Sequence, residues 1–153
     1  MSHNKRRDFI SVSTLEEIKT ILSDVEQNSV IFLDVDDTLI TPRSKLFRSK
    51  SPYRALIDDI KKDRENVPHF EIILSRWRLQ RQTELVCEEW VDFFKEFKKK
   101  FSLYGLTKME TGSLGDIPSV EEWRYKELLQ KGLAFTPLFE GKEDEILLTS
   151  SEP

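Results

Sequence analysis

Cysteine and histidine are scarce in this chain of 153 residues, and their scarcity excludes several kinds of site. The one cysteine, Cys87, has no partner for an internal disulfide and cannot build a cysteine-based zinc site. The two histidines, His3 and His69, provide few nitrogen ligands for a transition metal. Five glycines and six prolines are too few for a collagen-like or linker-rich protein.

Long apolar runs and an excess of positive charge are also missing. No segment approaches the roughly 20 apolar residues that a membrane helix needs, and no apolar stretch of a secretory signal follows the polar segment 1–8. We therefore expect a cytoplasmic protein with no membrane partner. The net charge of −4, from 24 basic and 28 acidic residues, argues against a general nucleic-acid binder.

The abundant residues describe a globular protein with a polar surface. Hydrophobic residues make up 38% of the chain and charged residues 34%, with ten Phe and three Trp. A disordered chain would be poorer in such large apolar groups. The length fits one domain, so we expect residues 1–153 to form a single domain with its own core.

Apolar residues recur at helical spacing in several segments. Ser13 with Glu16 fits a capping box at the start of the first helix, and Ser119 with Glu122 fits one at the start of the last. Gly132 suits the C-terminal end of that last helix. The apolar spacing predicts helices over residues 14–27, 51–66 and 86–100, and the capping box with Gly132 predicts a helix over 119–131.

Short apolar runs predict the strands. Val30–Leu33 is an unbroken run of branched and aromatic residues, typical of a strand buried on both faces. Phe101–Thr107 is predicted to be a second buried strand, and Leu133–Phe135 suits the start of a third. Residues 69–85 fit both a helix and a strand, and we favour a helix. The order of helices and strands predicts an α/β fold with a parallel sheet.

Three carboxylates and a threonine follow the first predicted strand, in Asp34-Val35-Asp36-Asp37-Thr38. Open α/β sheets bind ligands at the carboxyl ends of their strands. In an extended chain Asp34 and Asp36 point the same way, and a close pair of carboxylates suits Mg²⁺, which prefers oxygen ligands. One carboxylate can then attack phosphorus, while the second acts as general acid and then as base.

The same segment also fits a purely structural role. An isolated Asp-x-Asp is more often a polar turn or a helix cap than a catalytic pair. The preceding strand, Thr38 and the apolar pair Leu39-Ile40 reverse that preference here. Thr38 can either orient the loop or donate a hydrogen bond to phosphoryl oxygens.

The segment Val30-Ile-Phe-Leu-Asp34-Val-Asp36-Asp37-Thr38 resembles the first signature of the haloacid dehalogenase-like (HAD) hydrolase superfamily. That signature consists of four apolar residues followed by Asp-x-Asp-x-Thr/Val. Leu103-Tyr-Gly-Leu-Thr107 resembles the second signature, an apolar strand that ends in Ser or Thr. The wider segments 105–112 and 122–128 resemble an uncharacterised bacterial HAD-like family of unknown function.

The resemblance implies a Rossmannoid core and a Mg²⁺-dependent phosphatase that forms an aspartyl phosphate from a small phosphorylated substrate. It implies that Asp34 is the nucleophile and a Mg²⁺ ligand. Asp36 would be the general acid and base, with its backbone carbonyl also on Mg²⁺. Thr107 would donate a hydrogen bond to the phosphoryl group, and residues 41–85 would form a helical cap inserted after the first strand.

Two further HAD signatures are not found in the sequence: a Lys that offsets phosphate charge, and an acidic pair that completes the Mg²⁺ site. Lys108 directly follows Thr107, which is the wrong place, and Glu143-Asp144 fits a solvated tail. The resemblance covers about residues 30–135. We therefore expect an incomplete, truncated HAD-like domain whose sheet is completed by a downstream segment or by self-association.

Two alternative functions stay open. The first is a non-catalytic fragment or pseudoenzyme, because the loss of a Lys and of a metal carboxylate removes electrostatic stabilisation on which phosphoryl transfer relies. The second is a phosphoacceptor receiver domain, which also clusters acids after its first strand. A receiver domain needs a second strand that ends in the acceptor Asp, and residues 101–107 lack it.

Two basic clusters offer further contacts for an anion. The first could attract a phosphorylated substrate, and the second could stack on a nucleobase. We favour a solvated surface for the first and amphipathic packing for the second. The first comprises Arg43, Lys45, Arg48 and Lys50, and the second comprises Arg76, Arg78 and Arg81 around Trp77.

Overall fold

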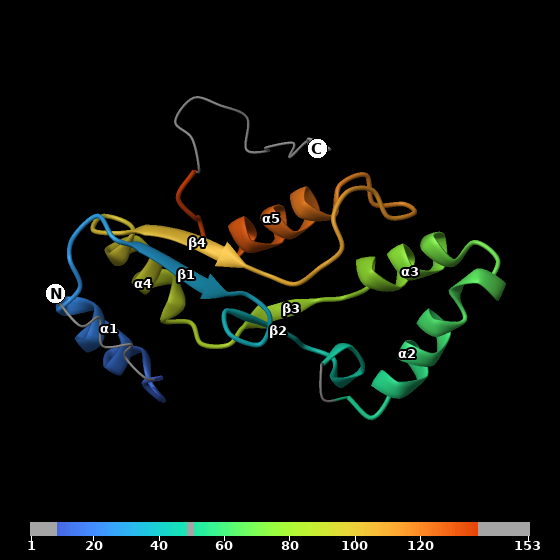
Figure 1. Ribbon diagram of the computed structural model, residues 1–153, viewed down its shortest axis with the longest axis horizontal. Coiled ribbons are helices and arrows are strands. Elements are labelled where there is room, and N and C mark those ends of the chain that lie inside the picture. The colour runs from blue at the N-terminus through green and yellow to red at the C-terminus, as the bar shows by residue number, and fades with distance from the viewer. Residues whose placement is uncertain (1–8, 49–50, 138–153) are drawn as a thin grey trace, which may run out of the picture.

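Two parallel strands form a small sheet, as the sequence predicts. In the computed structural model, which describes residues 9–48 and 51–137, β1 (Val30–Asp34) pairs with β4 (Ser102–Leu106). The register places Asp34 opposite Leu106, so both strands end at the same edge of the sheet. With five α-helices among the described residues, the protein is mixed α/β (Figure 1).

The first and last helices have polar caps close to the predicted positions. Thr14 caps α1 (Leu15–Ser23) by accepting the backbone N–H of Glu17, whose carboxylate accepts the Thr14 N–H in return. The predicted capping box at Ser13 and Glu16 is therefore wrong by one residue. Ser119 caps α5 (Val120–Gln130) as predicted, and it accepts the N–H of Glu122.

Two of the predicted helices begin later than expected. Helix α2 (Arg54–Lys62) starts three residues after the predicted cap Ser51, and a 3-10 turn at Arg64–Asn66 follows it. Helix α4 (Trp90–Phe97) starts four residues after the predicted position 86. The reason is a strand directly before it, because the chain must turn out of that strand before a helix can begin.

Residues 69–85 contain both of the structures that their sequence allows. Helix α3 (Phe70–Leu79) is followed by β3 (Thr83–Leu85), which pairs antiparallel with β2 (Ile40–Pro42). The preference for a helix is confirmed for 70–79 and wrong for 83–85. The β2–β3 pair connects the parallel sheet with α2 and α3, which lie together at the opposite end of the molecule (Figure 1).

The prediction that β1 is buried on both faces is wrong. Ile31 and Leu33 pack against the main core, whereas Val30 is 50% exposed and Phe32 is 60% exposed. Side chains alternate between the two faces of a strand, and within residues 9–48 and 51–137 no element covers the second face. Phe32 lies against the ring of Tyr104 on that face, with 5.9 Å between the ring centroids.

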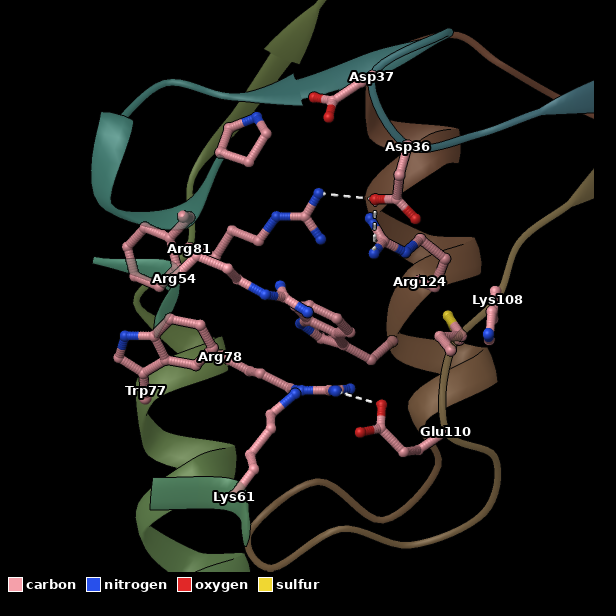
Figure 2. Close-up of a pocket in the computed structure, with 14 residues that line it drawn as sticks. Asp36, Asp37, Arg54, Lys61, Trp77, Arg78, Arg81, Lys108, Glu110 and Arg124 are labelled. Carbon is pink, nitrogen blue, oxygen red and sulfur yellow. Dashed lines mark hydrogen bonds and ion pairs between the residues drawn. The ribbon is translucent and has the colours of Figure 1, made fainter. Parts of the chain in front are cut away.

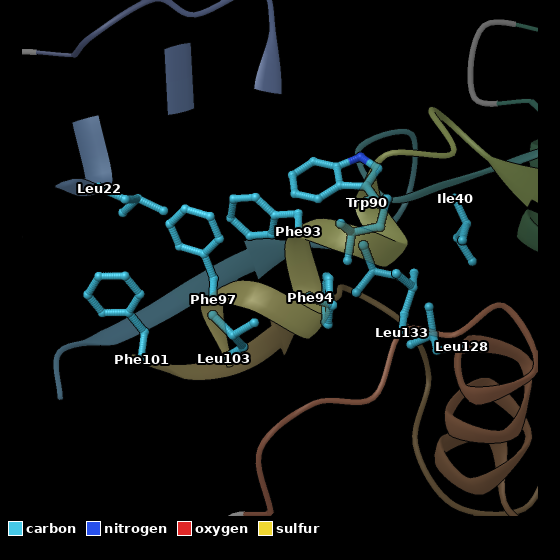
Figure 3. Close-up of a cluster of buried hydrophobic side chains, with 12 residues drawn as sticks. Leu22, Ile40, Trp90, Phe93, Phe94, Phe97, Phe101, Leu103, Leu128 and Leu133 are labelled. Carbon is cyan, nitrogen blue, oxygen red and sulfur yellow. The ribbon is translucent and has the colours of Figure 1, made fainter. Parts of the chain in front are cut away.

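The main core is an aromatic cluster on the other face of the sheet (Figure 3). Phe93 and Phe97 stack with their centroids 4.3 Å apart, and Trp90 meets Phe93 edge-on at 5.1 Å. These residues lie on α4, and Leu22 of α1 and Leu103 of β4 complete the contact. The predicted apolar face of the segment 86–100 therefore forms the centre of the protein.

A second apolar cluster joins α3 to α5 and to the loop between β4 and α5. Its buried members are Leu74, Leu114, Ile117 and Val120. The loop approaches α3 so closely that a Cβ on Gly115, at φ 51°, would collide with the carbonyl of Glu71. This packing fixes the distance between the two helices whose side chains form the site described below.

The predicted third strand is not formed as a strand in the described residues. Residues 133–137 instead run beside β4, where the Thr136 N–H donates to the Leu103 carbonyl at 2.9 Å. The Thr136 hydroxyl accepts the Leu103 N–H at 2.9 Å. The solvated tail expected around Glu143-Asp144 lies outside the described residues. None of the helices within 9–48 and 51–137 has the length and apolar character required to cross a membrane.

Candidate functional site

Asp34, the last residue of β1, and Asp36, in the loop that follows, lie in different surroundings. The exposed Asp34 carboxylate accepts a 2.8 Å hydrogen bond from the Thr38 hydroxyl. The indole N–H of Trp90 donates to the Thr38 carbonyl at 3.1 Å and thereby fastens the loop to the main core. Asp37 has a backbone φ of 60° in this turn. Unlike Asp34, Asp36 faces a pocket, and the lining of that pocket does not include Asp34.

Three side chains from distant parts of the sequence bind the Asp36 carboxylate. Its Oδ1 accepts hydrogen bonds from Arg81 at 2.8 Å and from Arg124 at 3.2 Å. Its Oδ2 accepts a hydrogen bond from the Thr107 hydroxyl at 3.0 Å. The two arginines reach Asp36 from opposite sides of the pocket, because Arg81 follows α3 and Arg124 lies on α5 (Figure 2).

The surrounding charges keep Asp36 ionised. Burial acts to raise the pKa of Asp36, but the charge of Arg124, the hydrogen bond and charge of Arg81, and the Thr107 hydroxyl together hold that pKa below its usual value. Burial also lowers the pKa of Arg124, against the charges of Asp36 and Glu127. Arginine stays cationic at any physiological pH, so the contact is a true ion pair.

A second carboxylate, that of Glu127, forms an ion pair with Arg124. Glu127 accepts from Arg124 at 2.8 Å and from the buried Thr83 hydroxyl at 2.6 Å. Lys131 donates to the Thr83 carbonyl at 2.7 Å. Thr83 lies on β3, directly after the pair of helices α2 and α3 (the α2–α3 unit, residues 54–79). These hydrogen bonds therefore connect β3 to α5, and the bond from Arg124 to Glu127 sets the direction of the Arg124 side chain.

The pocket has a volume of about 630 Å³ and lies between the α2–α3 unit on one side and α5 with the loop after β4 on the other (Figure 2). Its polar lining is mainly cationic, with six basic side chains and three acidic ones. The basic residues are Arg54, Lys61, Arg78, Arg81, Lys108 and Arg124, and the acidic residues are Asp36, Asp37 and Glu110. Such a pocket favours an anionic ligand.

Aromatic residues form part of the pocket wall. Trp77 packs against Phe47 with 4.8 Å between ring centroids, and both line the pocket. Trp123 lies opposite on α5, with the Arg124 guanidinium 5.4 Å from its ring centroid. A ligand in the pocket would therefore touch both positive charge and flat apolar surface.

The end of the pocket away from Asp36 contains an ion pair between Arg78 and Glu110 (Figure 2). Burial acts to raise the pKa of Glu110, but the hydrogen bond and charge of Arg78, with a smaller effect from Lys61, hold that pKa below its usual value. Two cations thus face one acid at this end. Among the residues that the structure describes, neither Lys61 nor Lys108 forms an ion pair.

Two buried donors in the site lack a partner. The Nε atoms of Arg81 and Arg124 are buried and donate no hydrogen bond within the described part of the chain. The side chains of these arginines are 14% and 7% exposed. Buried polar groups without a partner are uncommon in proteins and mark places where a ligand or water completes the hydrogen bonding.

Sequence reasoning singled out Asp36 and Thr107, considered Arg78 and Arg81 only as members of the basic cluster around Trp77, and did not consider Arg124. The packing interpretation of the cluster around Trp77 is wrong for Arg78 and Arg81, which line the pocket. Arg124 lies on α5, and no local sequence pattern distinguishes its position from a solvent-exposed position of the helix. In the other cluster, Arg43 and Arg48 fit the predicted surface, since they lie 3.7 and 3.8 Å from Glu84 and neither lines the pocket. Lys50 lies outside the described residues.

The predicted Mg²⁺ site has few protein ligands in the described residues. No group of three Asp, Glu, His or Cys side chains converges within 9–48 and 51–137. Both Asp36 carboxylate oxygens accept hydrogen bonds from other side chains. In the expected site the exposed Asp34 carboxylate and the Asp36 backbone carbonyl would provide protein oxygens, and Mg²⁺ commonly takes its other ligands from water and substrate phosphate.

Comparison with known proteins identifies a relative but no family. An uncharacterized protein of Rickettsia prowazekii (strain Madrid E) is 28% identical over 128 residues, which cover 82% of this chain and 46% of the relative. The chain therefore spans less than half the length of that relative. No protein-family model and no solved structure matches the chain.

Proposed function

We propose that this protein binds a phosphorylated small molecule and hydrolyses its phosphate ester. The observation that carries the proposal is the buried pair Arg81 and Arg124, which converge on Asp36 in a cationic pocket at the carboxyl edge of a parallel sheet. Arginines that present their N–H groups together are suited to phosphate oxygens. The proposed fold is an incomplete HAD-like Rossmannoid core with residues 41–85 as its cap.

In the proposed reaction Asp34 is the nucleophile. Its exposed carboxylate attacks phosphorus, the bond between phosphorus and the ester oxygen breaks, and the departing alcohol takes a proton from Asp36. Asp36 then removes a proton from water, whose oxygen attacks the phosphorus of the aspartyl phosphate. The bond between phosphorus and the Asp34 oxygen breaks, inorganic phosphate leaves, and Asp36 releases its proton to solvent when it pairs again with the arginines.

The arginines have two tasks in this proposal. In the ligand-free protein they hold Asp36 ionised, and an ionised carboxylate cannot protonate a leaving group. A phosphate dianion that replaces Asp36 on Arg81 and Arg124 would remove this restraint, and Asp36 would then take up a proton from solvent, which it passes to the leaving alcohol. Thr107 would keep the Asp36 side chain in place, and Thr38 would do the same for Asp34.

Mg²⁺ remains the proposed cofactor. Asp34 and the Asp36 backbone carbonyl would hold it, and the ion would offset negative charge between the nucleophile and the phosphate. The small number of protein ligands predicts weak metal binding in the absence of substrate.

A non-catalytic phosphate-binding protein is the alternative. It is favoured by the engagement of both Asp36 oxygens and by the lack of a three-acid metal group in the described residues. In this alternative the pocket with Arg81 and Arg124 binds phosphate, but Asp34 does not act as a nucleophile. The two functions therefore agree on binding and differ on turnover.

The test is hydrolysis of phenyl phosphate by the full chain, with Mg²⁺ and with EDTA. We expect release of inorganic phosphate that requires Mg²⁺ and that Asp34→Asn abolishes. Asp24→Asn, which changes an exposed carboxylate after α1, should retain full activity. Phosphate binding by calorimetry without turnover would support the non-catalytic alternative, and absence of both binding and turnover would contradict both functions.

A further inference from the structure

The pocket is larger than a single phosphate group requires. Its volume of about 630 Å³ lies within the range of about 300–1,000 Å³ that accommodates a small organic ligand. The organic part of the substrate would therefore fill the remaining volume. The side chains that line this volume indicate the chemistry of the organic part.

Most of the cations in the pocket have an acidic partner. Arg81 and Arg124 are balanced by Asp36 and Glu127. Two further arginines pair separately: Arg78 with Glu110, and Arg54 with Asp58. These pairs leave little net charge where they form.

Lys61 and Lys108 are the exceptions. In the described portion of the chain neither has an acidic side chain at ion-pairing distance, although both line the pocket. Lys61 lies in the last turn of α2, beside Arg78 and Glu110, and Asp36 lies at the opposite end of the pocket (Figure 2). The unpaired positive charge of Lys61 is therefore away from Asp36, where the proposed reaction takes place.

The pocket wall also contains apolar side chains. Trp77, Trp123 and Met109 line the pocket together with the cations. A ligand with a flat or apolar centre and an anionic group at each end would match this arrangement.

We infer that the substrate carries a second anionic group, separate from the phosphate that is transferred, and that Lys61 binds it. This inference rests on the proposed function, because it takes the phosphate to occupy the end of the pocket with Arg81 and Arg124. Lys61 donates charge-assisted hydrogen bonds to the second group, and Lys108 adds positive charge on the other side.

Two ligands that differ only in the second anion test the inference. Phenyl phosphate has one anionic group, and 4-carboxyphenyl phosphate has the same ring with a carboxylate at its far end. We expect the carboxylated ligand to bind about tenfold more tightly, the effect of one charge-assisted hydrogen bond. Calorimetry with the Asp34→Asn protein measures both affinities without turnover.

Lys61→Met removes the charge and keeps the length of the side chain. We expect this variant to bind the carboxylated ligand about tenfold more weakly, with the affinity for phenyl phosphate unchanged. Lys98→Met is the matched control, because Lys98 is an exposed lysine at the end of α4 that does not line the pocket. Thermal unfolding of each variant verifies that the fold is retained.

The results separate the two proposals. Equal affinity for the two ligands, or an equal loss of both in Lys61→Met, would overturn the second-anion inference and leave the proposed function standing. Failure of the protein to bind either ligand would overturn the proposed function and the inference together.

Discussion

The Thr107 hydroxyl donates a hydrogen bond of 3.0 Å to the Asp36 carboxylate, across 71 residues of sequence. The parallel pairing of β1 with β4 explains this contact, since Asp34 stands opposite Leu106 and the following residues meet just beyond the sheet. Arg81 and Arg124 then reach the same carboxylate from two other elements. Four segments of the chain thus meet at one side chain, and this convergence leads to specific predictions.

Asp36→Asn should destabilise the protein by about 1–2 kcal/mol near neutral pH, because two buried arginines lose their anionic partner. This value is at the low end for a buried pair, since the Asp36 side chain is 41% exposed. The pKa of Asp36 is lowered by folding from 3.8. Its ionised form therefore stabilises the fold above that unfolded-state pKa, and this contribution is lost as the pH falls through the folded-state pKa.

Urea unfolding of wild type and Asp36→Asn near neutral pH and below pH 3.8 measures this effect. The difference in unfolding free energy should shrink as the pH falls below the unfolded-state value. Asp59→Asn is the control, because Asp59 forms an exposed pair with Lys62 that should contribute little. A difference that stays constant over the whole pH range would show that the ion pairs do not account for the stability.

Arg124→Lys should weaken the binding of inorganic phosphate by about tenfold, measured by calorimetry. Lysine retains the positive charge, but it cannot contact Asp36 and Glu127 and still present a further N–H to a ligand. Arg76→Lys is the control, because Arg76 pairs with Asp116 on the surface and does not line the pocket. An unchanged affinity in Arg124→Lys would exclude Arg124 from the phosphate site.

Thr83→Val should destabilise the protein by about 1–3 kcal/mol. The substitution retains the shape of a buried side chain but removes the hydroxyl that donates to Glu127 at 2.6 Å. One Glu127 oxygen then loses its partner in a nearly buried position. Thermal unfolding compares this variant with Thr20→Val, whose exposed hydroxyl donates only to the carbonyl of Glu16 in the same helix. Equal effects of the two changes would contradict the structural role of the Thr83–Glu127 contact.

Gly115→Ala should be more destabilising than Gly112→Ala. Both glycines have positive φ, so a side chain at either position introduces backbone strain of about 1–2 kcal/mol. At Gly112 an added Cβ meets no atom within 4 Å, whereas at Gly115 it collides with the Glu71 carbonyl and the Ser75 hydroxyl. Urea unfolding should therefore give a larger loss for Gly115→Ala, and similar losses would mean that the loop can move away from α3.

Periodicity and polar caps were sufficient to locate most of the helices. The apolar spacing of α1 and α4 is a local property, because each helix buries one face whatever its partner is. The polar cap at Ser119 that begins α5 is local as well. The same holds for the runs that form β1 and β4. The predictions failed at β3, which was expected to be helical, and at the face of β1 that is exposed. Both results depend on which segment of the chain lies alongside, and a local sequence pattern does not contain that information.

The sequence by itself determined that carboxylates follow a strand, and that Thr107 ends a second strand which can lie beside the first. The sequence placed Asp36 and Thr107 in one predicted site because both follow apolar strands whose carboxyl ends bind ligands. The direct hydrogen bond between them is a finding of the structure. Only the tertiary structure decided that Arg81 and Arg124 converge on Asp36. An arginine on a helix has the same neighbours in sequence whether it faces solvent or a pocket. The packing of α3 and α5 around their shared apolar cluster decides that these arginines face the pocket.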